Sequence, residues 1–230
     1  MPGLNAGIAR HAVDVAIAQR PDLVLLLGDY AASFEHKRRP NRWMYERGIR
    51  ALEPELRRLR PPDGVIAALG NHDHYHDPAA TRRWLEGLGI RVLVNEHLLL
   101  RRGDGVLRIG AVDDAFEGTV DPRRALGTSA DAPPTILLSH NPDGVLSLTP
   151  DVRADVVLSG HTHGGQVVLP FIGAPITHSR VCHAHAASGW VPNAHAPLFV
   201  SRGIAGQIPL RFNCPPELPI ARLRAMPGRT

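Results

Sequence analysis

The stretch LVLLLGDY (residues 23–30) decides the fold, because it joins an unbroken apolar run to a Gly-Asp pair. The run has strand length and shows no alternation of polar and apolar residues, which is typical of a strand buried on both faces. Gly28 then allows a sharp turn, and Asp29 follows directly where the strand ends. The stretch therefore predicts an open α/β sheet with a carboxylate at the edge where its strands end.

The same pattern, an apolar run that ends in a polar cluster, occurs again in VIAALGNHD (65–73), ILLSHN (136–141) and VVLSGHTH (156–163). In open α/β sheets, ligand sites gather at the carboxyl ends of the strands. We therefore expect the polar side chains of these strand ends to meet at one place. The side chains concerned are Asp29, Asn71, His72, Asp73, His140, His161 and His163.

The rest of the chain also predicts both helices and strands. Apolar periodicity predicts helices over 4–18, 42–59 and 78–88. Strands are predicted at 23–27, 65–69, 91–94, 97–101, 106–111, 136–138 and 156–158, with further short strands at 165–168, 197–201 and 217–223. Because no repeat, linker or low-complexity tract interrupts this order, residues 1–230 are expected to form a single domain.

Composition narrows the class of protein. The 43% of hydrophobic residues argues against a disordered chain, and no apolar run reaches the ~20 residues of a membrane-spanning helix. The formal charge of +4 comes from scattered arginines without interleaved aromatic residues, which argues against a nucleic-acid-binding module. Such a surface suits solvent, anionic substrates or an anionic membrane face. Cys182 and Cys214 permit one disulfide without establishing it.

The donor types in the expected site indicate a metal. Imidazole, carboxylate and amide oxygen together suit Mn, Fe, Zn or similar ions, and the absence of a thiolate from the set argues against a structural zinc or iron–sulfur site. Each motif alone is a weak signal, since Gly-Asp after a strand usually marks only a turn. Their combination, with each motif at a strand end, favours a functional site over a chance cluster of loop residues.

The motifs G-D, G-N-H-D, S-H and G-H-T-H, in this order, resemble the calcineurin-like metallophosphoesterase family. Three segments resemble its bacterial membrane-associated branch, which has phosphodiesterases of the YaeI and YkuE type: VLVNEHLLL (92–100), LSGHTHGGQVVLP (158–170) and FVSRGIAGQIPLRFNCPPELPIARL (199–223). Some relatives in this branch hydrolyse UDP-2,3-diacylglucosamine in lipid A synthesis. The resemblance implies a four-layer α/β/β/α sandwich with two facing mixed sheets.

The resemblance also implies two divalent metal ions, Mn, Fe or Zn, and hydrolysis of a phosphodiester or pyrophosphate bond by a metal-activated water. By position in the motifs, Asp29 would bridge the two metals. Asn71, His140 and His161 would complete the second metal site, and His163 would be a ligand of the first.

Four further residues receive roles outside the metal sites. His72 would stabilise the transition state or protonate the leaving oxygen, and Asp73 would orient His72. Arg202 and Arg211 lie in a segment that resembles the family, and their guanidinium groups suit substrate phosphate. A structural role for these arginines in a loop network fits the sequence equally well.

One departure from the family pattern concerns the first metal site. The family has an Asp-x-His pair one helix before the Gly-Asp, and no such pair precedes Asp29 here. His11 and Asp14 fit the polar face of a helix better than displaced ligands. We therefore expect either an N-terminally truncated domain that lacks its first core strand or a degenerate first site. Either would bind one metal per chain at best and hydrolyse phosphoesters poorly.

The expected partner is a phosphoester substrate that is lipid- or nucleotide-linked, with peripheral membrane association as a possibility. The alternative is a catalytically impaired metal-binding or interaction protein. Localisation stays open between the cytoplasm and a membrane of a bacterium. His74 and His76 are expected to be exposed loop residues or to line the substrate cleft. The late-loop histidines, which form either an exposed loop or an auxiliary metal site, are His178, His183, His185 and His195.

Overall fold

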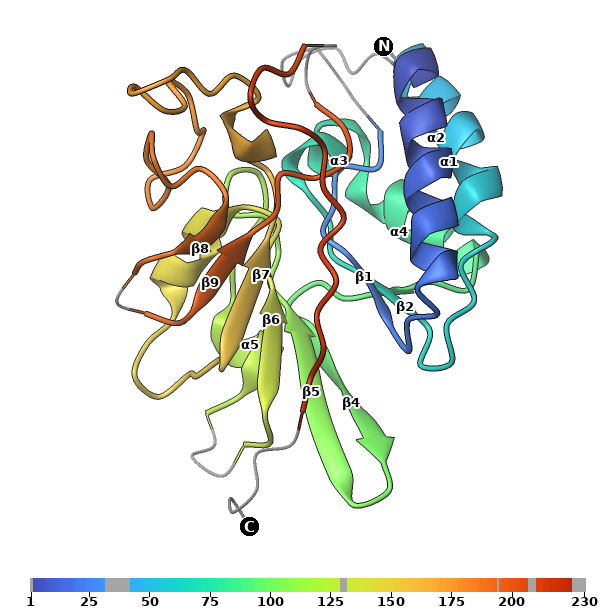
Figure 1. The fold of residues 1–230 in the computed structure, drawn as a ribbon. Helices are drawn as coiled ribbons and strands as arrows, with labels where there is room; N and C mark the ends of the chain where they lie inside the picture. Colours follow the sequence, from blue (N-terminus) through green and yellow to red (C-terminus); the bar gives the residue numbers. More distant parts are fainter. Residues whose placement is uncertain (1, 32–41, 129–131, 194, 207–209, 225–230) are drawn as a thin grey trace.

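Two β-sheets that face each other form the centre of the molecule (Figure 1). The computed structural model describes residues 2–31, 42–128, 132–193, 195–206 and 210–224. The first sheet has three parallel strands, in the order β1-β2-β3. They are β1 (Val24–Leu26), β2 (Val65–Ala67) and β3 (Arg91–Val92).

The second sheet is mixed and has six strands, in the order β4-β5-β6-β7-β9-β8. Its strands are β4 (Glu96–Arg102), β5 (Gly105–Ala111), β6 (Thr135–Leu138), β7 (Val156–Ser159), β8 (Gly189–Val191) and β9 (Leu198–Val200). The pairs β4–β5 and β8–β9 are antiparallel, and the pairs between β5, β6, β7 and β9 are parallel. The carboxyl ends of β6 and β7 therefore lie side by side, as the sequence predicts for strands that deliver site residues.

Helices cover the outer faces of both sheets (Figure 1). The helices α1 (Pro2–Ala18), α2 (Arg42–Leu56) and α4 (Pro78–Gly87) belong to the side of the first sheet. The short helix α5 (Pro122–Leu126) and the 3₁₀ turn η1 (Pro142–Ser147) pack on the second sheet. Two short elements begin directly at the site, α3 (Asn71–His76) and η2 (His163–Gly165).

Three apolar cores separate the four layers. Leu56, Leu85 and Ile90 belong to the core between the first sheet and its helices. Ile66 of β2 and Leu138 of β6 belong to the core between the two sheets. A third core, between the second sheet and its outer cover, is centred on buried side chains such as Leu126, Val145 and Leu198. The predicted four-layer α/β/β/α sandwich is therefore confirmed, while the loss of a first core strand stays a prediction.

Two of the predicted strands are wrong. Residues 165–168 include the end of η2, and only Val167 pairs, in an isolated bridge with Phe212. Gly165 and Gln166 have φ values of +78° and +54°, which are incompatible with a strand. Residues 217–223 form no regular structure. Pro219 interrupts them, and a proline has no N–H to give to a sheet.

Several short elements were not predicted from the sequence, and the first of them begins at the site. The motif of residues 70–73 opens helix α3, for which Gly70 is the N-cap residue. Helix α5 has a readable start signal, since Asp121 accepts a hydrogen bond from Arg124 N at 2.9 Å and is followed by Pro122. Strand β8 is only three residues long, which is too short for a pattern of alternation to be recognised.

Candidate metal centre

Two glycines let the ends of β1 and β2 approach closely. Gly28 has φ +103°, and a Cβ added to it would lie 2.6 Å from Gly70 N. A Cβ on Gly70 would lie 2.3 Å from Asp29 Oδ1. Neither position has room for a side chain, so the two Gly-containing turns pack backbone against backbone. This contact brings Asp29 and Asn71 to the same side of the sheet edge.

His140 follows β6 and faces both of these residues. Its Nδ1 lies 2.7 Å from Leu27 O, so this nitrogen carries the donated proton and Nε2 is turned to the site. His140 Nε2 lies 3.1 Å from Asp29 Oδ2 and 3.2 Å from Asn71 Oδ1. Burial alone would lower the pKa of His140, but the charge of Asp29 outweighs it and raises the pKa to about 9.

His161 follows β7 and completes the group. Its Nδ1 lies 2.9 Å from Asn71 Oδ1 and 3.2 Å from His140 Nε2, while its Nε2 lies 3.1 Å from His178 O. Burial and the neighbouring His140 lower the pKa of His161 to about 3. His161 is therefore neutral at physiological pH, with its Nδ1 lone pair directed into the site.

The four side chains fit a divalent cation. In each histidine the outer ring nitrogen is bound to a backbone carbonyl, which leaves the inner nitrogen available as a ligand. Asp29, His140 and His161 each offer a ligand atom, and these atoms lie within 4.8 Å of one another. Oxygen and nitrogen ligand atoms thus converge on one point, where a bound cation would replace the proton that His140 Nε2 carries at neutral pH.

Asp29 is held as a carboxylate. Burial raises its pKa, but the charge and hydrogen bond of His140 outweigh burial, and the pKa lies well below its ordinary value. Its Oδ1 accepts a hydrogen bond from His72 N at 2.9 Å, at the start of α3. Its Oδ2 is the oxygen that faces His140. One oxygen therefore fixes the side chain and the other is turned to the site.

These strand-end motifs match a known family. The sequence profile described as calcineurin-like phosphoesterase matches residues 5–165. The chain belongs to the calcineurin-like phosphoesterase family. Members of this family are metal-dependent hydrolases, so the predicted family and enzyme class are confirmed.

Individual relatives support the assignment. An uncharacterised metallophosphoesterase of Bacillus subtilis, YkuE, is 32% identical over 90% of this chain and 69% of its own length. The phosphodiesterase YaeI of Escherichia coli is 28% identical over 92% of this chain and 74% of its own length. The UDP-2,3-diacylglucosamine pyrophosphatase LpxG of Chlamydia muridarum is 37% identical, over 50% of this chain and 37% of its own.

Among solved structures, the NAD nucleotidase of Haemophilus influenzae superposes with a TM-score of 0.51 at 16% identity. The match covers 86% of this chain and 39% of the nucleotidase. This likeness concerns the fold alone. Among the residues that the structure describes, none of the helices has the length and apolar character needed to cross a membrane.

Asp73 of this metallophosphoesterase connects the two strand ends. Its Oδ2 accepts hydrogen bonds from Gly70 N and Asp29 N, both at 2.9 Å, and its Oδ1 accepts one from Tyr30 N at 3.2 Å. The side chain is fully buried, and burial together with the charge of Asp29 raises its pKa to about 7. Asp73 therefore holds the backbone of both motifs in place. Its predicted role behind His72 stays a prediction.

His72 and His163 lie beside the buried group. The His72 ring packs edge-on against Tyr75, with 5.4 Å between ring centres, and its catalytic role stays a prediction. His163 is half-buried in η2, and burial lowers its pKa to about 4. The structure does not include His163 in the convergent group of Asp29, His140 and His161. Its assignment to a separate metal is an expectation that the site leaves open.

Arg211 binds the backbone beneath His163. Its Nη1 donates to His163 O at 3.0 Å and Cys214 O at 3.1 Å, and its Nη2 donates to Arg202 O at 2.9 Å and to Ala205 O. The Cys214 thiol also donates to His163 O, at 3.3 Å. Both cysteines of the chain are buried free thiols, so the permitted disulfide is not formed.

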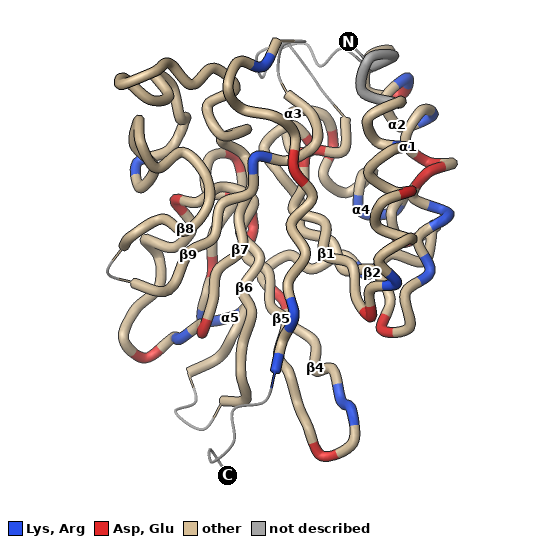
Figure 2. The backbone as a smooth tube through the Cα atoms, in the orientation of Figure 1, with Lys and Arg blue, Asp and Glu red and all other residues tan. Residues whose placement is uncertain are grey.

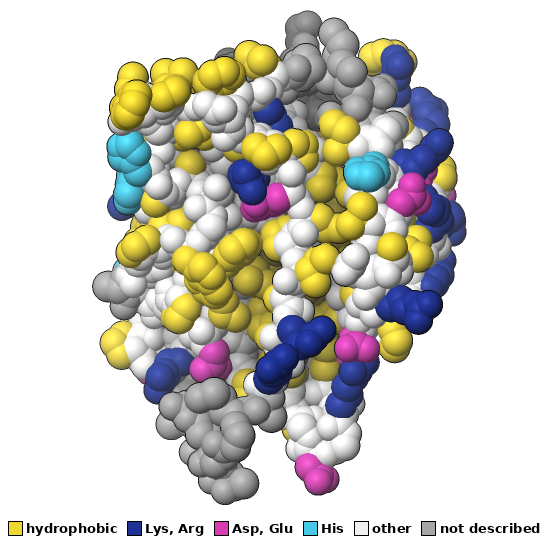
Figure 3. Space-filling model, in the orientation of Figure 1, with side chains coloured by type: hydrophobic (Ala, Val, Ile, Leu, Met, Phe, Trp, Pro, Cys, Tyr) yellow, Lys and Arg dark blue, Asp and Glu magenta, His cyan; other side chains and the backbone are white. Residues whose placement is uncertain are grey.

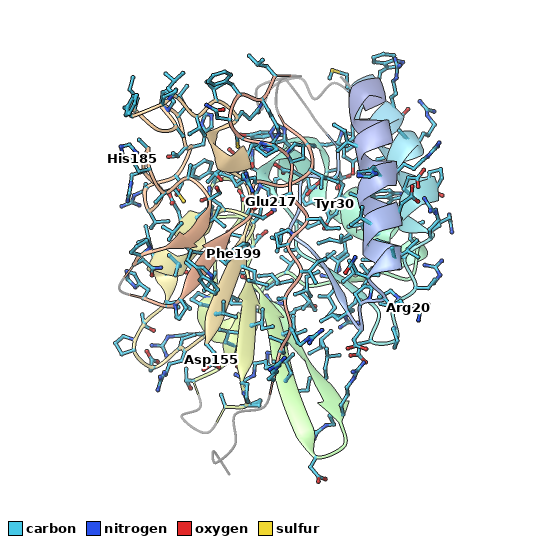
Figure 4. The ribbon with its side chains drawn as sticks, in the orientation of Figure 1. Arg20, Tyr30, Asp155, His185, Phe199 and Glu217 are labelled. Carbon is cyan, nitrogen blue, oxygen red and sulfur yellow. The ribbon has the colours of Figure 1, made fainter. Side chains whose placement is uncertain are left out.

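Arg202 is also engaged within the protein. Its Nε and Nη2 lie 2.7 and 2.6 Å from Glu217 Oε2 (Glu217 is labelled in Figure 4). The contacts of Arg202 and Arg211 are thus those of the structural alternative that the sequence left open. Their assignment to substrate binding stays a prediction without a contact that favours it.

Sequence reasoning missed a polar pair at the rim. His74 Nε2 lies 2.8 Å from Asp113 Oδ1, and His76 stacks on Tyr45 with 3.6 Å between ring centres. Both histidines are half-buried on α3, so the expectation of exposed loop residues was wrong. Asp113 and the buried Asp114 follow β5 after one intervening residue, and the strand-end rule applied to the other motifs could have found them.

The late-loop histidines fit the exposed-loop alternative. His178, His183, His185 and His195 are all exposed, and His185 lies at the outer side of its loop (Figure 4). Within the described ranges, the search for His, Cys and acidic side chains that could share a metal returned the group of Asp29 and no group of these histidines. The auxiliary metal site is therefore not supported.

Proposed function

We propose that the protein hydrolyses a phosphodiester or pyrophosphate bond with a metal-activated water. The observation that carries the proposal is the convergence of Asp29, Asn71, His140 and His161, with ligand atoms 2.9–3.2 Å apart and outer ring nitrogens already bound. The names of two relatives point the same way, because one is a phosphodiesterase and another a pyrophosphatase.

The metal chemistry fits these residues. Divalent ions, when bound, lower the pKa of a coordinated water and neutralise charge on the phosphate. Asp29, Asn71, His140 and His161 would hold one ion tightly, and Asp29 with His163 would contribute only a weakly held second ion, since His163 is outside the convergent group. Mn, Fe and Zn all suit a mixed set of imidazole, carboxylate and amide oxygen.

The remaining residues prepare the site for proton transfer. His72 N–H fixes Asp29 Oδ1, so the His72 side chain starts from the rim of the site, one residue after Asn71. We assign His72 as the group that gives a proton to the leaving oxygen. Asp73 keeps the turns of Asp29 and Gly70 together through its three backbone hydrogen bonds. Movement of either turn would displace His72 from the metal ligands.

The proposed substrates are lipid-linked or nucleotide-linked phosphates, among them UDP-2,3-diacylglucosamine, the substrate named for a relative that shares 37% identity over half of this chain. A lipid-linked substrate would bring the protein to a membrane surface. Such peripheral association is compatible with the basic surface of the chain, which carries a formal charge of +4.

A second candidate is a catalytically impaired metal-binding or interaction protein. One observation favours it: among the described residues, a single group of three His and Asp side chains has convergent ligand atoms, and His163 is outside that group. The two candidates differ in turnover. Both predict metal binding, but only the first predicts hydrolysis that depends on His72.

The test is hydrolysis of a chromogenic phosphodiester with Mn²⁺. We expect Asp29→Ala to abolish turnover and His72→Ala to lower it by about 10²–10⁴-fold, the usual contribution of a general acid. His195→Ala, which removes an exposed histidine from the loop between β8 and β9, is the matched control and should retain full activity. Equal rates for the wild type, Asp29→Ala and His72→Ala would refute the site. No turnover in the metal-loaded wild type would favour the second candidate.

A further inference from the structure

The loop between η2 and β8 presents apolar side chains to solvent. Phe171 is 100% exposed, and Ile172 and Ile176 are each 59% exposed. No other large hydrophobic side chain in the described ranges is as exposed as Phe171. Single exposed apolar side chains are common, but several in one loop form a patch of the kind found at interaction surfaces.

The backbone under Phe171 is equally unusual. Leu169 and Gly173 exchange backbone hydrogen bonds of 2.8 and 2.9 Å, so residues 170–172 form the tip of a tight hairpin. Phe171 lies at this tip with φ +64°, in the left-handed region that favours glycine. A bulky apolar residue at such a position is costly to the fold, which points to a use for its side chain.

The tip belongs to an anchored loop. The carboxylate of Asp143 accepts hydrogen bonds from Ser179 Oγ at 2.6 Å and from the backbone N of Arg180 and Val181 at 2.8 and 3.2 Å. On the other side of the hairpin, Ala174 N donates to Ala184 O at 2.7 Å. These bonds hold the loop against the protein while the side chains at the tip remain outside.

The same loop borders the metal centre. It follows η2, which begins with His163 and ends at Gly165, and the carbonyl of His178 accepts the hydrogen bond from His161. Phe116 packs edge-on against His161 at 4.9 Å between ring centres and is itself 46% exposed. Figure 3 shows hydrophobic side chains gathered along the edge formed by the loops above β8. The loop that carries the exposed apolar side chains therefore also borders the proposed catalytic site.

The charged side chains of residues 156–216 are all basic. No Asp or Glu occurs between Asp155 and Glu217. The loop itself carries exposed Arg180 and the exposed imidazoles of His178, His183 and His185. In Figure 2 its tube shows blue but no red. The Asp143 carboxylate under the loop is buried and bound to backbone N–H groups. An apolar tip beside basic groups, in a loop whose own sequence has no acidic residue, is complementary to an anionic lipid surface.

We propose that Phe171 and Ile172 insert into an anionic membrane surface and that Arg180 contacts the lipid headgroups. The inference rests on the lipid-linked substrate class proposed above, because insertion would bring the rim of the metal centre to the bilayer. A convex tip with two projecting apolar side chains suits insertion between lipids, whereas a protein partner of ordinary interface size needs a broader complementary face.

Cosedimentation with vesicles tests the proposal, using phosphatidylcholine alone and phosphatidylcholine mixed with phosphatidylglycerol. We expect the wild-type chain to pellet with the mixed vesicles and poorly with phosphatidylcholine alone. The double variant Phe171→Ser, Ile172→Ser should partition about tenfold less, because two apolar side chains no longer leave water. Phe171→Trp should bind as the wild type does, and Arg180→Ser should weaken only the binding to mixed vesicles.

Trp43→Ser is the matched control, since it removes a 59% exposed aromatic residue from α2 and should leave binding unchanged. The proposal is overturned if wild-type chain does not pellet with mixed vesicles, or if the double variant pellets equally well. Equal binding to both vesicle types would overturn the choice of an anionic surface. Loss of a dimer in the double variant, without vesicle binding by the wild type, would assign the tip to a second copy of the chain.

Hydrolysis of a soluble chromogenic phosphodiester separates this inference from the proposed function. Because Phe171 is 100% exposed and Ile172 is 59% exposed, at the tip of the hairpin, the double variant should hydrolyse the soluble substrate at the wild-type rate. Turnover without vesicle binding would overturn the inference and leave the proposed function standing. Vesicle binding that depends on Phe171, in a chain without turnover, would overturn the proposed hydrolysis and leave the membrane-binding tip standing.

Discussion

The two sides of the candidate metal centre are held in different ways. Asp29, Asn71, His140 and His161 come from four strand ends and are oriented by bonds to their own side chains, such as that from His140 Nδ1 to Leu27 O. These four residues are the four-residue side of the centre. The other side, the His163 side, is different: His163 is oriented indirectly, because Arg211 and Cys214 bind its backbone carbonyl.

The backbone of the His163 side explains why it needs this support. Residues 163–166 are four consecutive residues in the left-handed region, with φ values of +51°, +64°, +78° and +54°. On the four-residue side, the left-handed residues Asp29 (+60°) and His161 (+65°) lie in separate turns, each directly after a glycine. Each non-glycine residue there costs roughly 1–2 kcal/mol. The four-residue side thus depends on the register of the sheets, whereas the His163 side depends on a few tertiary hydrogen bonds. Substitutions on the four-residue side should therefore affect metal affinity most, whereas substitutions on the His163 side should affect stability most.

The largest effect is expected for His140→Ala. The change removes the imidazole that contacts both Asp29 and Asn71, so affinity for Mn²⁺ should fall by more than the ~10–100-fold that loss of an outer-shell partner causes. Isothermal titration with Mn²⁺ measures the loss. His163→Ala should weaken the tightly held ion much less. Equal losses in the two variants would remove the distinction between the two sides.

Arg211→Ala should destabilise the His163 side. It leaves four backbone carbonyls without their guanidinium donor, and we expect a loss of about 2–4 kcal/mol in the free energy of unfolding. Chemical denaturation measures this loss. Arg211→Lys should recover part of it, and the exposed Arg180→Ala serves as control. If Arg211→Ala were as stable as the control and lost only affinity for substrate, the predicted substrate-binding role would be restored.

Gly164→Ala should cost somewhat less, about 1–3 kcal/mol. A Cβ at this position would lie 2.5 Å from Arg202 Cγ and 2.6 Å from Cys214 Sγ, and the φ of +64° strains any side chain. Thermal unfolding compares it with Gly87→Ala, whose Cβ would meet nothing within 4 Å. Gly87→Ala should unfold at or above the wild-type temperature. A wild-type melting temperature for Gly164→Ala would show that the turn is not packed as described.

The smallest effect concerns pH and the rim pair of His74 and Asp113. Burial alone would lower the pKa of His74, but the hydrogen bond and charge of Asp113 raise it above 6.5. The stabilisation is therefore complete below pH 6.5 and is lost as pH rises through the folded-state pKa. We expect His74→Gln to remove a stability change of about 0.5 kcal/mol over this range. His185→Gln, on an exposed loop, should not alter the pH profile of unfolding.

That the residues of the four-residue side lie close together could be expected from the sequence, because each comes within three residues of the end of an apolar run, while their role as metal ligands stays a prediction. Glycines at 28 and 70 carry the signal, since close approach of two strand ends excludes a side chain. The His163 side was less predictable. The bonds from Arg211 to His163 O join residues 48 positions apart and depend on how two irregular segments pack. The same reason explains the wrong strand at 165–168, where tertiary contacts override an apolar pattern.

Metal content of the dialysed chain tests the central claim most directly. After loading with Mn²⁺, the wild type and His163→Ala are expected to retain one ion per chain, and His161→Ala none, because only the last change opens the group of Asp29, Asn71 and His140. Elemental analysis gives the stoichiometry, and loading with Co²⁺ gives a visible spectrum that reports the nitrogen ligands. Two tightly held ions in the wild type, or an ion retained in His161→Ala, would contradict the account.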